Sequence, residues 1–165
     1  MPASGGIKHV DANVWLAIAA DGHTHHAIAT SWFDGQGSSS CALCRVTQMA
    51  LLRHLTNSKI MGVNVQTQIE AWRSCDELGN DPRVVFLQEP LGLEAAFRRL
   101  TQAGSPCHTL WTDAYLAASA VESQAQLVSF DRRFRRFGGL AFLALTDAQV
   151  STGTAGGLES EGMTP

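Results

Sequence analysis

The spacing of apolar residues changes period along the chain. Short apolar runs typical of buried strands fall at 7–10, 40–46, 84–87, 126–130 and 142–145. Apolar residues at helical spacing predict helices at 14–20, 24–33, 48–55, 65–78, 91–102 and about 111–123. Because strands and helices alternate, the pattern predicts an α/β fold, a three-layer α/β/α sandwich around a mainly parallel sheet.

Turn and cap residues suggest where these elements end. We interpret Thr47 as the N-cap of helix 48–55, which Thr56-Asn57-Ser58 then breaks, and we place the C-terminal cap of helix 65–78 at Gly79 and Asn80. Residues 1–6 are predicted to be a flexible lead. The Gly-rich stretch 151–165 is predicted to be a disordered tail. One domain at 7–146 remains between them.

Bulk composition indicates an ordinary globular protein. The chain has 165 residues, of which 45% are hydrophobic, enough for one domain with a substantial core. No apolar run is long enough to span a membrane, and the N-terminus lacks the features of a signal peptide. We therefore expect a cytoplasmic protein with no membrane partner.

The formal net charge of −3 does not by itself indicate a nucleic-acid binder, but the positive charge is concentrated. Four of the 12 basic residues are Arg132, Arg133, Arg135 and Arg136. Guanidinium groups suit bidentate contacts to phosphate. An exposed basic helix face explains the same run equally well.

Two other groups of side chains raise the question of a metal. Cys41 and Cys44 have CxxC spacing and Cys107 could complete a zinc site, but the first two fall in a predicted strand, so we favour buried thiols. His23, His25 and His26 do not share one helix face. For the histidines we favour packing and hydrogen bonding at a helix start.

Three aspartates stand where a strand ends or a helix starts: Asp11, Asp113 and Asp131. In a parallel sheet such positions gather at the carboxyl edge of the strands, where ligands bind. Carboxylates brought together repel one another and favour a hard divalent cation such as Mg²⁺ or Mn²⁺. The alternative is that each aspartate merely caps a helix or a turn. The three together favour a metal site.

A metal-activated water attacking a phosphodiester is the chemistry that this site suggests. Asn13 and Thr112 are candidate supporting polar groups. Trp111 precedes Asp113 and is expected to border the site, with base stacking as the less favoured role. No GxGxxG, Walker or GxSxG motif occurs, so those nucleotide-binding and serine-nucleophile schemes are not indicated.

Several short motifs, in order from about residue 7 to 145, together resemble a known family. They are Val10-Asp11-Ala12-Asn13-Val14-Trp15-Leu16-Ala17, the His-rich helix start, Cys44-Arg45-Val46-Thr47-Gln48 with Arg53-His54-Leu55-Thr56-Asn57, Leu110-Trp111-Thr112-Asp113-Ala114-Tyr115-Leu116-Ala117-Ala118, and Val128-Ser129-Phe130-Asp131-Arg132. The ordered set resembles PIN-domain proteins of the VapC toxin type.

The resemblance implies a PIN fold and a Mg²⁺- or Mn²⁺-dependent endoribonuclease, the toxin of a type II toxin–antitoxin pair. It also implies inhibition by a VapB-type antitoxin and a homodimer or toxin–antitoxin hetero-oligomer. Asp11, Asp113 and Asp131 match three of the family's four acidic positions. The fourth, a glutamate in many members, is replaced near Gln48 or Ala50 by a neutral residue.

We expect Gln48 to support the site through its amide, with lower metal affinity than four acids would give. Arg45, Arg132 and Arg133 are expected to contact RNA phosphates. The missing fourth acid leaves an alternative open, a catalytically weak PIN-fold module that binds RNA or a partner. A metal-dependent phosphatase or DNA nuclease using the same carboxylates is a third possibility.

Overall fold

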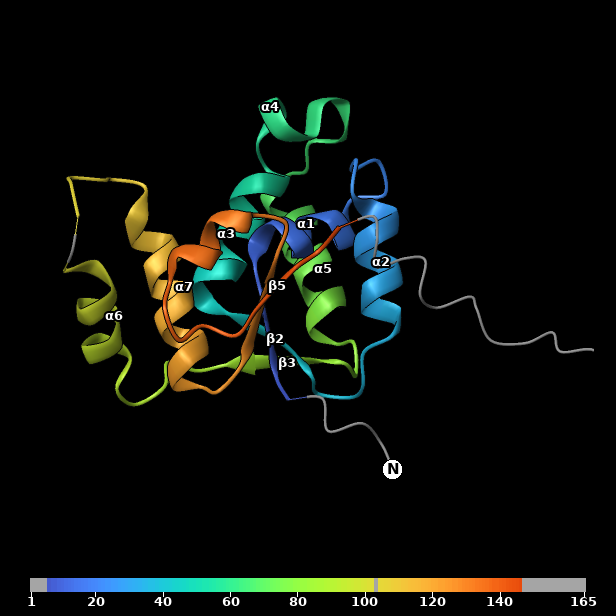
Figure 1. Ribbon diagram of the computed structural model, residues 1–165. Helices are drawn as coiled ribbons and strands as arrows, with labels where there is room; N and C mark the ends of the chain where they lie inside the picture. The colour runs from blue at the N-terminus through green and yellow to red at the C-terminus, as the bar shows by residue number, and fades with distance from the viewer. Residues whose placement is uncertain (1–5, 103, 147–165) are drawn as a thin grey trace, which may run out of the picture.

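The computed structural model describes residues 6–102 and 104–146, and within them five strands form one sheet (Figure 1). The strands are β1 (Lys8–Val10), β2 (Cys41–Cys44), β3 (Val84–Leu87), β4 (Gln126–Ser129) and β5 (Phe142–Ala144). Their order is β3-β2-β1-β4-β5, and all four neighbouring pairs are parallel. The predicted α/β fold with a parallel sheet is confirmed.

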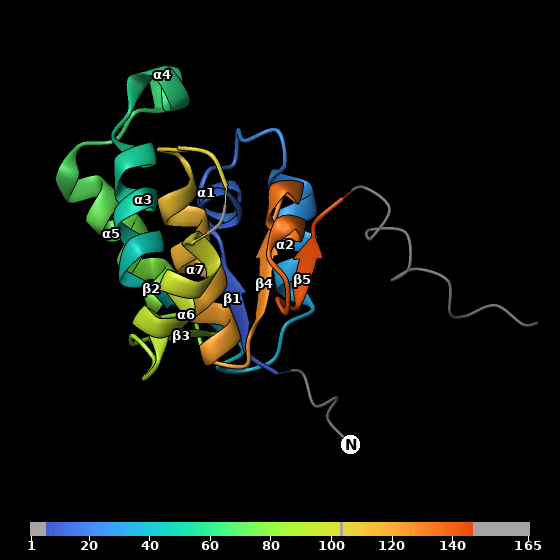
Figure 2. The ribbon, with the colours of Figure 1, turned by 60° about the vertical axis from the view of Figure 1, so that its left-hand side comes forward.

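Helices cover both faces of this sheet (Figure 2). Four of them share one hydrophobic core on the first face: α1 (Ala12–Ala19), α2 (His26–Asp34), α3 (Arg45–Leu55) and α5 (Gln68–Gly79). On the second face α7 (Leu110–Glu122) packs on the sheet, and α6 (Leu93–Thr101) packs on α7. The short elements are α4 (Ser58–Met61), η1 (Gly62–Asn64) and η2 (Arg132–Arg136).

Neighbouring side chains of β4 show how the strand pattern builds two cores. Val128 belongs to the core formed with α1, α2, α3 and α5, whereas Leu127 belongs to the core formed with α7 and η2. Successive residues of a strand point to opposite faces, so a central parallel strand must be apolar on both. Trp15 fills the first core and Phe134 anchors η2 to the second, and each is almost fully buried.

The strand order places a topological switch point beside β1. Strand β1 lies in the middle of the sheet, with β2 as its neighbour on one side and β4 as its neighbour on the other. The strand order therefore reverses direction at β1. In open α/β sheets, the carboxyl ends of strands at such a point frame a crevice where ligands bind. Asp11 directly follows β1 and Asp131 lies two residues beyond β4.

Two expectations about helix starts were wrong, whereas the predicted break after residue 55 is confirmed. The first helix begins at Ala12 rather than residue 14, because Asp11 caps it. Thr47 is not an N-cap: α3 begins at Arg45, and the Thr47 hydroxyl, one turn into the helix, accepts a 3.0 Å hydrogen bond from the Cys44 amide. The break at Thr56-Asn57-Ser58 leads into α4, which the Asn57 side chain caps through the Lys59 amide.

The predicted tail and most of the predicted lead lie outside the described residues. Within 6–102 and 104–146, no helix is both long and apolar enough to cross a membrane.

Candidate active site

Asp11 lies at the junction of β1 and α1, and the fold holds both of its carboxylate oxygens. Oδ1 accepts a 2.7 Å hydrogen bond from the Ala12 amide, and Oδ2 accepts one of 2.7 Å from the Ser129 hydroxyl. Burial raises the pKa of Asp11 to about 6, although both hydrogen bonds act in the opposite direction. Asp11 therefore caps α1 through a carboxylate whose ionised form is destabilised by burial.

Ser129, the last residue of β4, connects the polar groups around Asp11. Besides donating to Asp11, its hydroxyl lies 3.0 Å from the Asn13 amide nitrogen and accepts a 2.9 Å bond from the Asp131 backbone amide. Ser129 itself is fully buried. Sequence reasoning missed this residue, although a lone hydroxyl in an apolar strand next to an aspartate was an available signal.

Asp131 caps η2 and faces an arginine of that same element. Its Oδ1 accepts from the Arg133 amide at 2.9 Å, and the Arg133 guanidinium makes a bidentate pair with the carboxylate, at 2.6 Å to Oδ2. This hydrogen bonding lowers the pKa of Asp131. Arg133 is thus paired with an aspartate in this structure, and its expected contact with RNA stays a prediction.

Asp113 lies in the first turn of α7, and Arg136 of η2 reaches it across the sheet edge at 2.8 Å. Burial raises the pKa of Asp113, while Arg136 and Arg133 oppose the shift. The sequence analysis noted Arg136 only as one residue of a basic run and predicted no role for it at the site. Its partner could not be foreseen because the two residues lie 23 positions apart.

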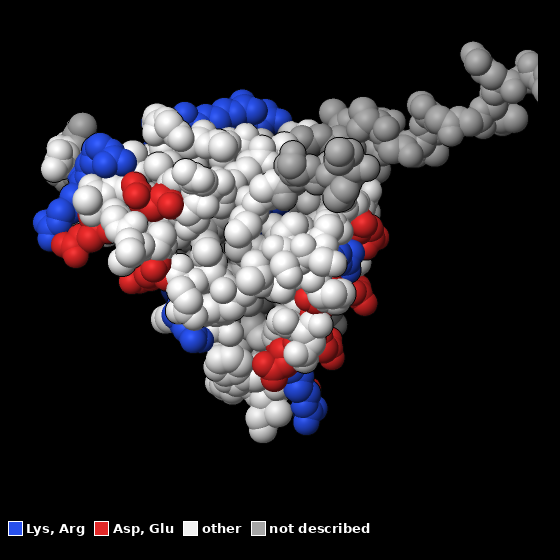
Figure 3. All heavy atoms as spheres, turned by 90° about the horizontal axis from the view of Figure 1, so that it is seen from below, with Lys and Arg blue, Asp and Glu red and all other residues white. Residues whose placement is uncertain are grey.

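The three carboxylates act on one another electrostatically. Asp113 and Asp131 each add to the raised pKa of Asp11, and Asp131 adds to that of Asp113. Their three elements meet at the carboxyl ends of β1 and β4. The opposite end of the molecule carries charged side chains mainly around its rim (Figure 3). The fold thus brings the predicted aspartates to one edge.

The chemistry of these donors fits a hard divalent cation. Carboxylate, amide and hydroxyl oxygens from Asp11, Asn13, Asp113, Ser129 and Asp131 are ligands that Mg²⁺ and Mn²⁺ accept. Within 6–102 and 104–146, no three His, Cys, Asp or Glu side chains are already arranged to hold a metal ion. Two of the carboxylates face arginines, so a cation would have to displace those guanidinium groups.

The other predicted site residues are Thr112, Arg132, Arg45 and Gln48, and they differ in how they are placed relative to the three aspartates. Thr112 is exposed beside Asp113 in α7, and Arg132 is exposed at the start of η2. Arg45 follows β2, stands 5.0 Å from the centre of the Phe86 ring and donates to the Gln48 side chain. Gln48 lines a hollow formed with the C-terminal part of α5 and with β3, and that hollow includes none of the three clustered aspartates.

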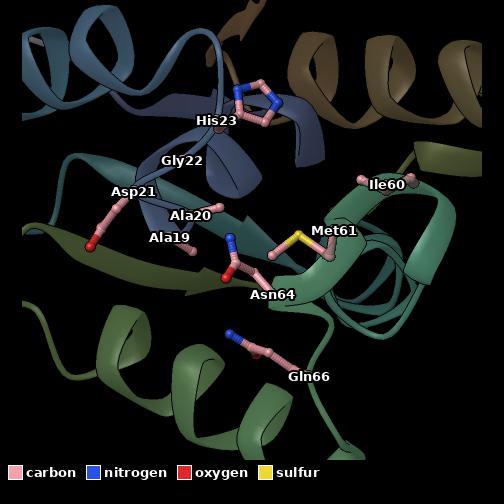
Figure 4. Close-up of a pocket in the computed structure, with 9 residues that line it drawn as sticks. All are labelled: Ala19, Ala20, Asp21, Gly22, His23, Ile60, Met61, Asn64 and Gln66. Carbon is pink, nitrogen blue, oxygen red and sulfur yellow. The ribbon is translucent and has the colours of Figure 1, made fainter.

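The histidines are used in packing and hydrogen bonds. His25 stacks on Phe130, with ring centres 4.5 Å apart, and a His26 ring nitrogen lies 2.7 Å from the Ala17 carbonyl oxygen. His23 borders a cavity between the α1–α2 loop and α4–η1, into which Met61 and Asn64 project (Figure 4). Asp21 lines this cavity, whereas Asp11, Asp113 and Asp131 do not.

Comparison with known proteins decides the family. The PIN domain family matches residues 8–140. Ribonuclease VapC41 of Mycobacterium tuberculosis is 39% identical over 135 residues, covering 79% of this chain and 92% of the relative. The chain belongs to the PIN-domain family of VapC proteins. A second VapC relative, Ribonuclease VapC37 of M. tuberculosis, is 30% identical over 136 residues, covering 81% of this chain and 94% of the relative.

Solved VapBC structures share the fold of this VapC-family chain. The structure of VapBC2 from Rickettsia felis, bound to a DNA fragment from their promoter, matches with a TM-score of 0.62 at 12% identity, covering 85% of this chain and 99% of that one. VapBC-1 from nontypeable Haemophilus influenzae matches with a TM-score of 0.60 at 16% identity, covering 84% and 97%. The predicted PIN-like fold is confirmed.

Proposed function

We propose that this VapC-family chain is a Mg²⁺- or Mn²⁺-dependent endoribonuclease, the toxin of a type II toxin–antitoxin pair. The observation that carries the proposal is the gathering of Asp11, Asp113 and Asp131 near the carboxyl ends of β1 and β4, where Ser129 donates to Asp11 and two arginines of η2 pair with the other two aspartates. The ribonuclease names of its relatives supply the reaction class. Carboxylates gathered at one place favour a divalent cation, and a bound cation would in turn attract the negatively charged phosphate of an RNA strand.

Asp11, Asp113 and Asp131 would hold the cation, which when bound supplies positive charge against the scissile phosphate and activates water. Ser129 orients Asp11 by donating to Oδ2, and Asn13 orients Ser129 in turn. With a pKa of about 6, Asp11 is mainly ionised at neutral pH and available as a ligand. Cleavage should therefore increase as pH rises through about 6.

Arginines at the rim are proposed to bind the RNA backbone. Arg45 and Arg132 are exposed on either side of the aspartate cluster, after β2 and at the start of η2. Arg133 would join them once it leaves Asp131, since a guanidinium released from a carboxylate is a strong phosphate ligand. Thr112 is exposed next to Asp113 and is proposed as a further polar contact.

A VapB-type antitoxin is the proposed protein partner, in a toxin homodimer or a toxin–antitoxin hetero-oligomer. Support comes from the solved neighbours, which are VapBC proteins. The cluster presents carboxylates that already accept arginine side chains of this chain. An inhibitor offering a guanidinium group would find the same acceptors.

One observation favours a second candidate, a catalytically weak module that binds RNA or a partner. Helix α3 contains no acidic residue, and the side-chain oxygen of Gln48 accepts a hydrogen bond from Arg45. Fewer negative ligands lower the affinity for a divalent cation. This candidate predicts RNA binding without turnover even in saturating Mn²⁺.

The test is cleavage of labelled RNA, DNA and a phosphomonoester with Mg²⁺, Mn²⁺ or a chelator. The proposal expects RNA cleavage that requires metal and stops with chelator. RNA binding without cleavage would support the second candidate, and cleavage that persists with chelator would refute the metal-dependent mechanism. Preference for DNA or the phosphomonoester would reassign the substrate.

A further inference from the structure

A pocket separate from the aspartate cluster lies between α6 and α7. It has a volume of about 590 Å³, within the range of roughly 300–1,000 Å³ typical of small-ligand sites. Its walls include Phe97, Trp111 and Tyr115, with the polar side chains Glu89, Glu94 and Arg98 around them. The described mechanism uses none of these residues.

Three aromatic rings form a continuous wall of this pocket. Phe97 of α6 lies edge-to-face with Trp111 at 6.0 Å between ring centres, and with Tyr115 at 6.1 Å. Trp111 and Tyr115 are one turn apart on α7, which places them on the same side of that helix. Trp111 is nevertheless 56% exposed, so much of its surface is open to a ligand. Large aromatic surfaces gain free energy when a flat apolar group covers them.

The polar groups of the pocket are already paired in a way that leaves the rings free. The Tyr115 hydroxyl donates to Glu89 at 2.8 Å, which fixes the tyrosine ring, and Arg98 donates to Glu94 at 2.9 Å. Both carboxylates therefore have a donor, and their repulsion of a polyanion is reduced. They also offer acceptor oxygens to the N–H groups at the edge of a planar ring.

The pocket is continuous with the proposed RNA path. A second hollow of about 390 Å³ shares Glu89 and Tyr115 with it and extends to Arg45 at the carboxyl end of β2. The α6–α7 pocket also lies close to the aspartates along the chain, because Trp111 comes two residues before Asp113 in the first turn of α7. Residues two apart project from opposite sides of a helix about 10 Å wide, a span that a few nucleotides bridge.

We propose that the α6–α7 pocket is a nucleobase subsite, in which a base of the bound RNA stacks on Trp111 while the strand passes over the first turn of α7 to the aspartates. The proposal rests on the proposed ribonuclease function and adds a determinant of which RNA is bound. Stacking on Trp111 contributes affinity, whereas the edge of the base faces Glu89 and Glu94.

A base fits this pocket better than an apolar segment of a protein partner. Besides the three aromatic rings and Leu93, the lining consists of polar side chains: two carboxylates, a guanidinium, the Thr101 hydroxyl and the Gln102 amide. This combination suits a flat ring with hydrogen-bonding edges. The connection through Tyr115 to Arg45 also supplies a phosphate ligand next to the base site.

The test measures binding of fluorescein-labelled six-nucleotide homopolymers of each RNA base to the full chain in a chelator, so that no cleavage occurs. Trp111→Ala should weaken binding of at least one homopolymer about 5- to 150-fold, and Trp111→Phe should restore much of the affinity. Trp72→Ala is the matched control, since Trp72 is 46% exposed on α5. Inorganic polyphosphate, which has no bases, should bind all variants equally. Thermal unfolding confirms that each variant is folded.

Equal RNA binding by Trp111→Ala and the unaltered chain would overturn the proposal, as would no RNA binding by either. An equal loss of polyphosphate binding would replace it with a phosphate contact. If Trp111→Ala weakened only the binding of an antitoxin, the pocket would be a protein docking site and the proposal would be wrong. Failure of the ribonuclease function is seen separately, as absence of RNA cleavage by the unaltered chain in Mn²⁺ while RNA binding persists.

Discussion

Replacing Asp11 by asparagine should stabilise the metal-free protein at neutral pH. Burial, together with the charges of Asp113 and Asp131, raises the pKa of Asp11 from 3.8 to about 6. The folded state therefore binds more protons than the unfolded state between these two values. Stability falls as pH rises through this window, and the cost is complete above about pH 6. Asparagine carries no charge and avoids the cost.

The size of the effect follows from the shift. Two pKa units correspond to about 3 kcal/mol of unfolding free energy at most. Asparagine is as good an N-cap as aspartate, so the bond from the Ala12 amide is kept. The rearranged contact with Ser129 costs about 1 kcal/mol. A net gain of about 2 kcal/mol corresponds to an increase in Tm of about 4–8 °C for a domain of this size.

The assay is thermal unfolding with chelator at pH 7.5 and at pH 4.0. Asp11→Asn should have the higher Tm at pH 7.5. At pH 4.0, where the native carboxyl is protonated, the gain should be lost and the variant should be slightly less stable, because the cost of the Ser129 contact remains. Asp76→Asn, at an exposed position of α5, is the control and should leave Tm unchanged at both values. A lower Tm for Asp11→Asn at pH 7.5, or a gain of the same size at both pH values, would refute the reasoning.

Three further changes test the surroundings of the site. Ser129→Ala removes a hydrogen bond that lowers the pKa of Asp11, so the rising limb of the pH–rate profile should move to higher pH; an unmoved limb would contradict this. Arg133→Ala removes the guanidinium that occupies Asp131, so calorimetry should show tighter Mn²⁺ binding, and weaker binding would count against displacement. Phe134→Ala should lower the unfolding free energy by about 3–5 kcal/mol in denaturant titrations, because this ring is 2% exposed in the core; a loss below about 1 kcal/mol would show that the core tolerates the cavity.

Apolar periodicity was sufficient to predict the sheet and the main helices because burial determines both. Val128 and Leu127 had to be apolar on opposite faces, and that requirement is visible in the sequence. Helix starts were less predictable. Threonine is a common N-cap residue. In α3, however, Thr47 lies one turn inside the helix, and its hydroxyl accepts a hydrogen bond from the backbone amide of Cys44, the residue directly before the helix.

The convergence of Asp11, Asp113 and Asp131 was predictable because parallel strands place their carboxyl ends at one edge. The side chains that contact these aspartates in the structure were not predictable from the sequence. Arg136 meets Asp113 only through the path of η2, and no local pattern encodes that contact. The expected role of Gln48 stays a prediction, since its described contacts are with Arg45 and the hollow next to α5.

The most direct test of the aspartate site is the rate of RNA cleavage by Asp113→Asn in saturating Mn²⁺, compared with the unaltered chain and Asp76→Asn. Asp113→Asn should lose metal-dependent cleavage while it keeps its fold, and Asp76→Asn should cleave as the unaltered chain does. Undiminished cleavage by Asp113→Asn would contradict the assignment of the three carboxylates as the catalytic centre.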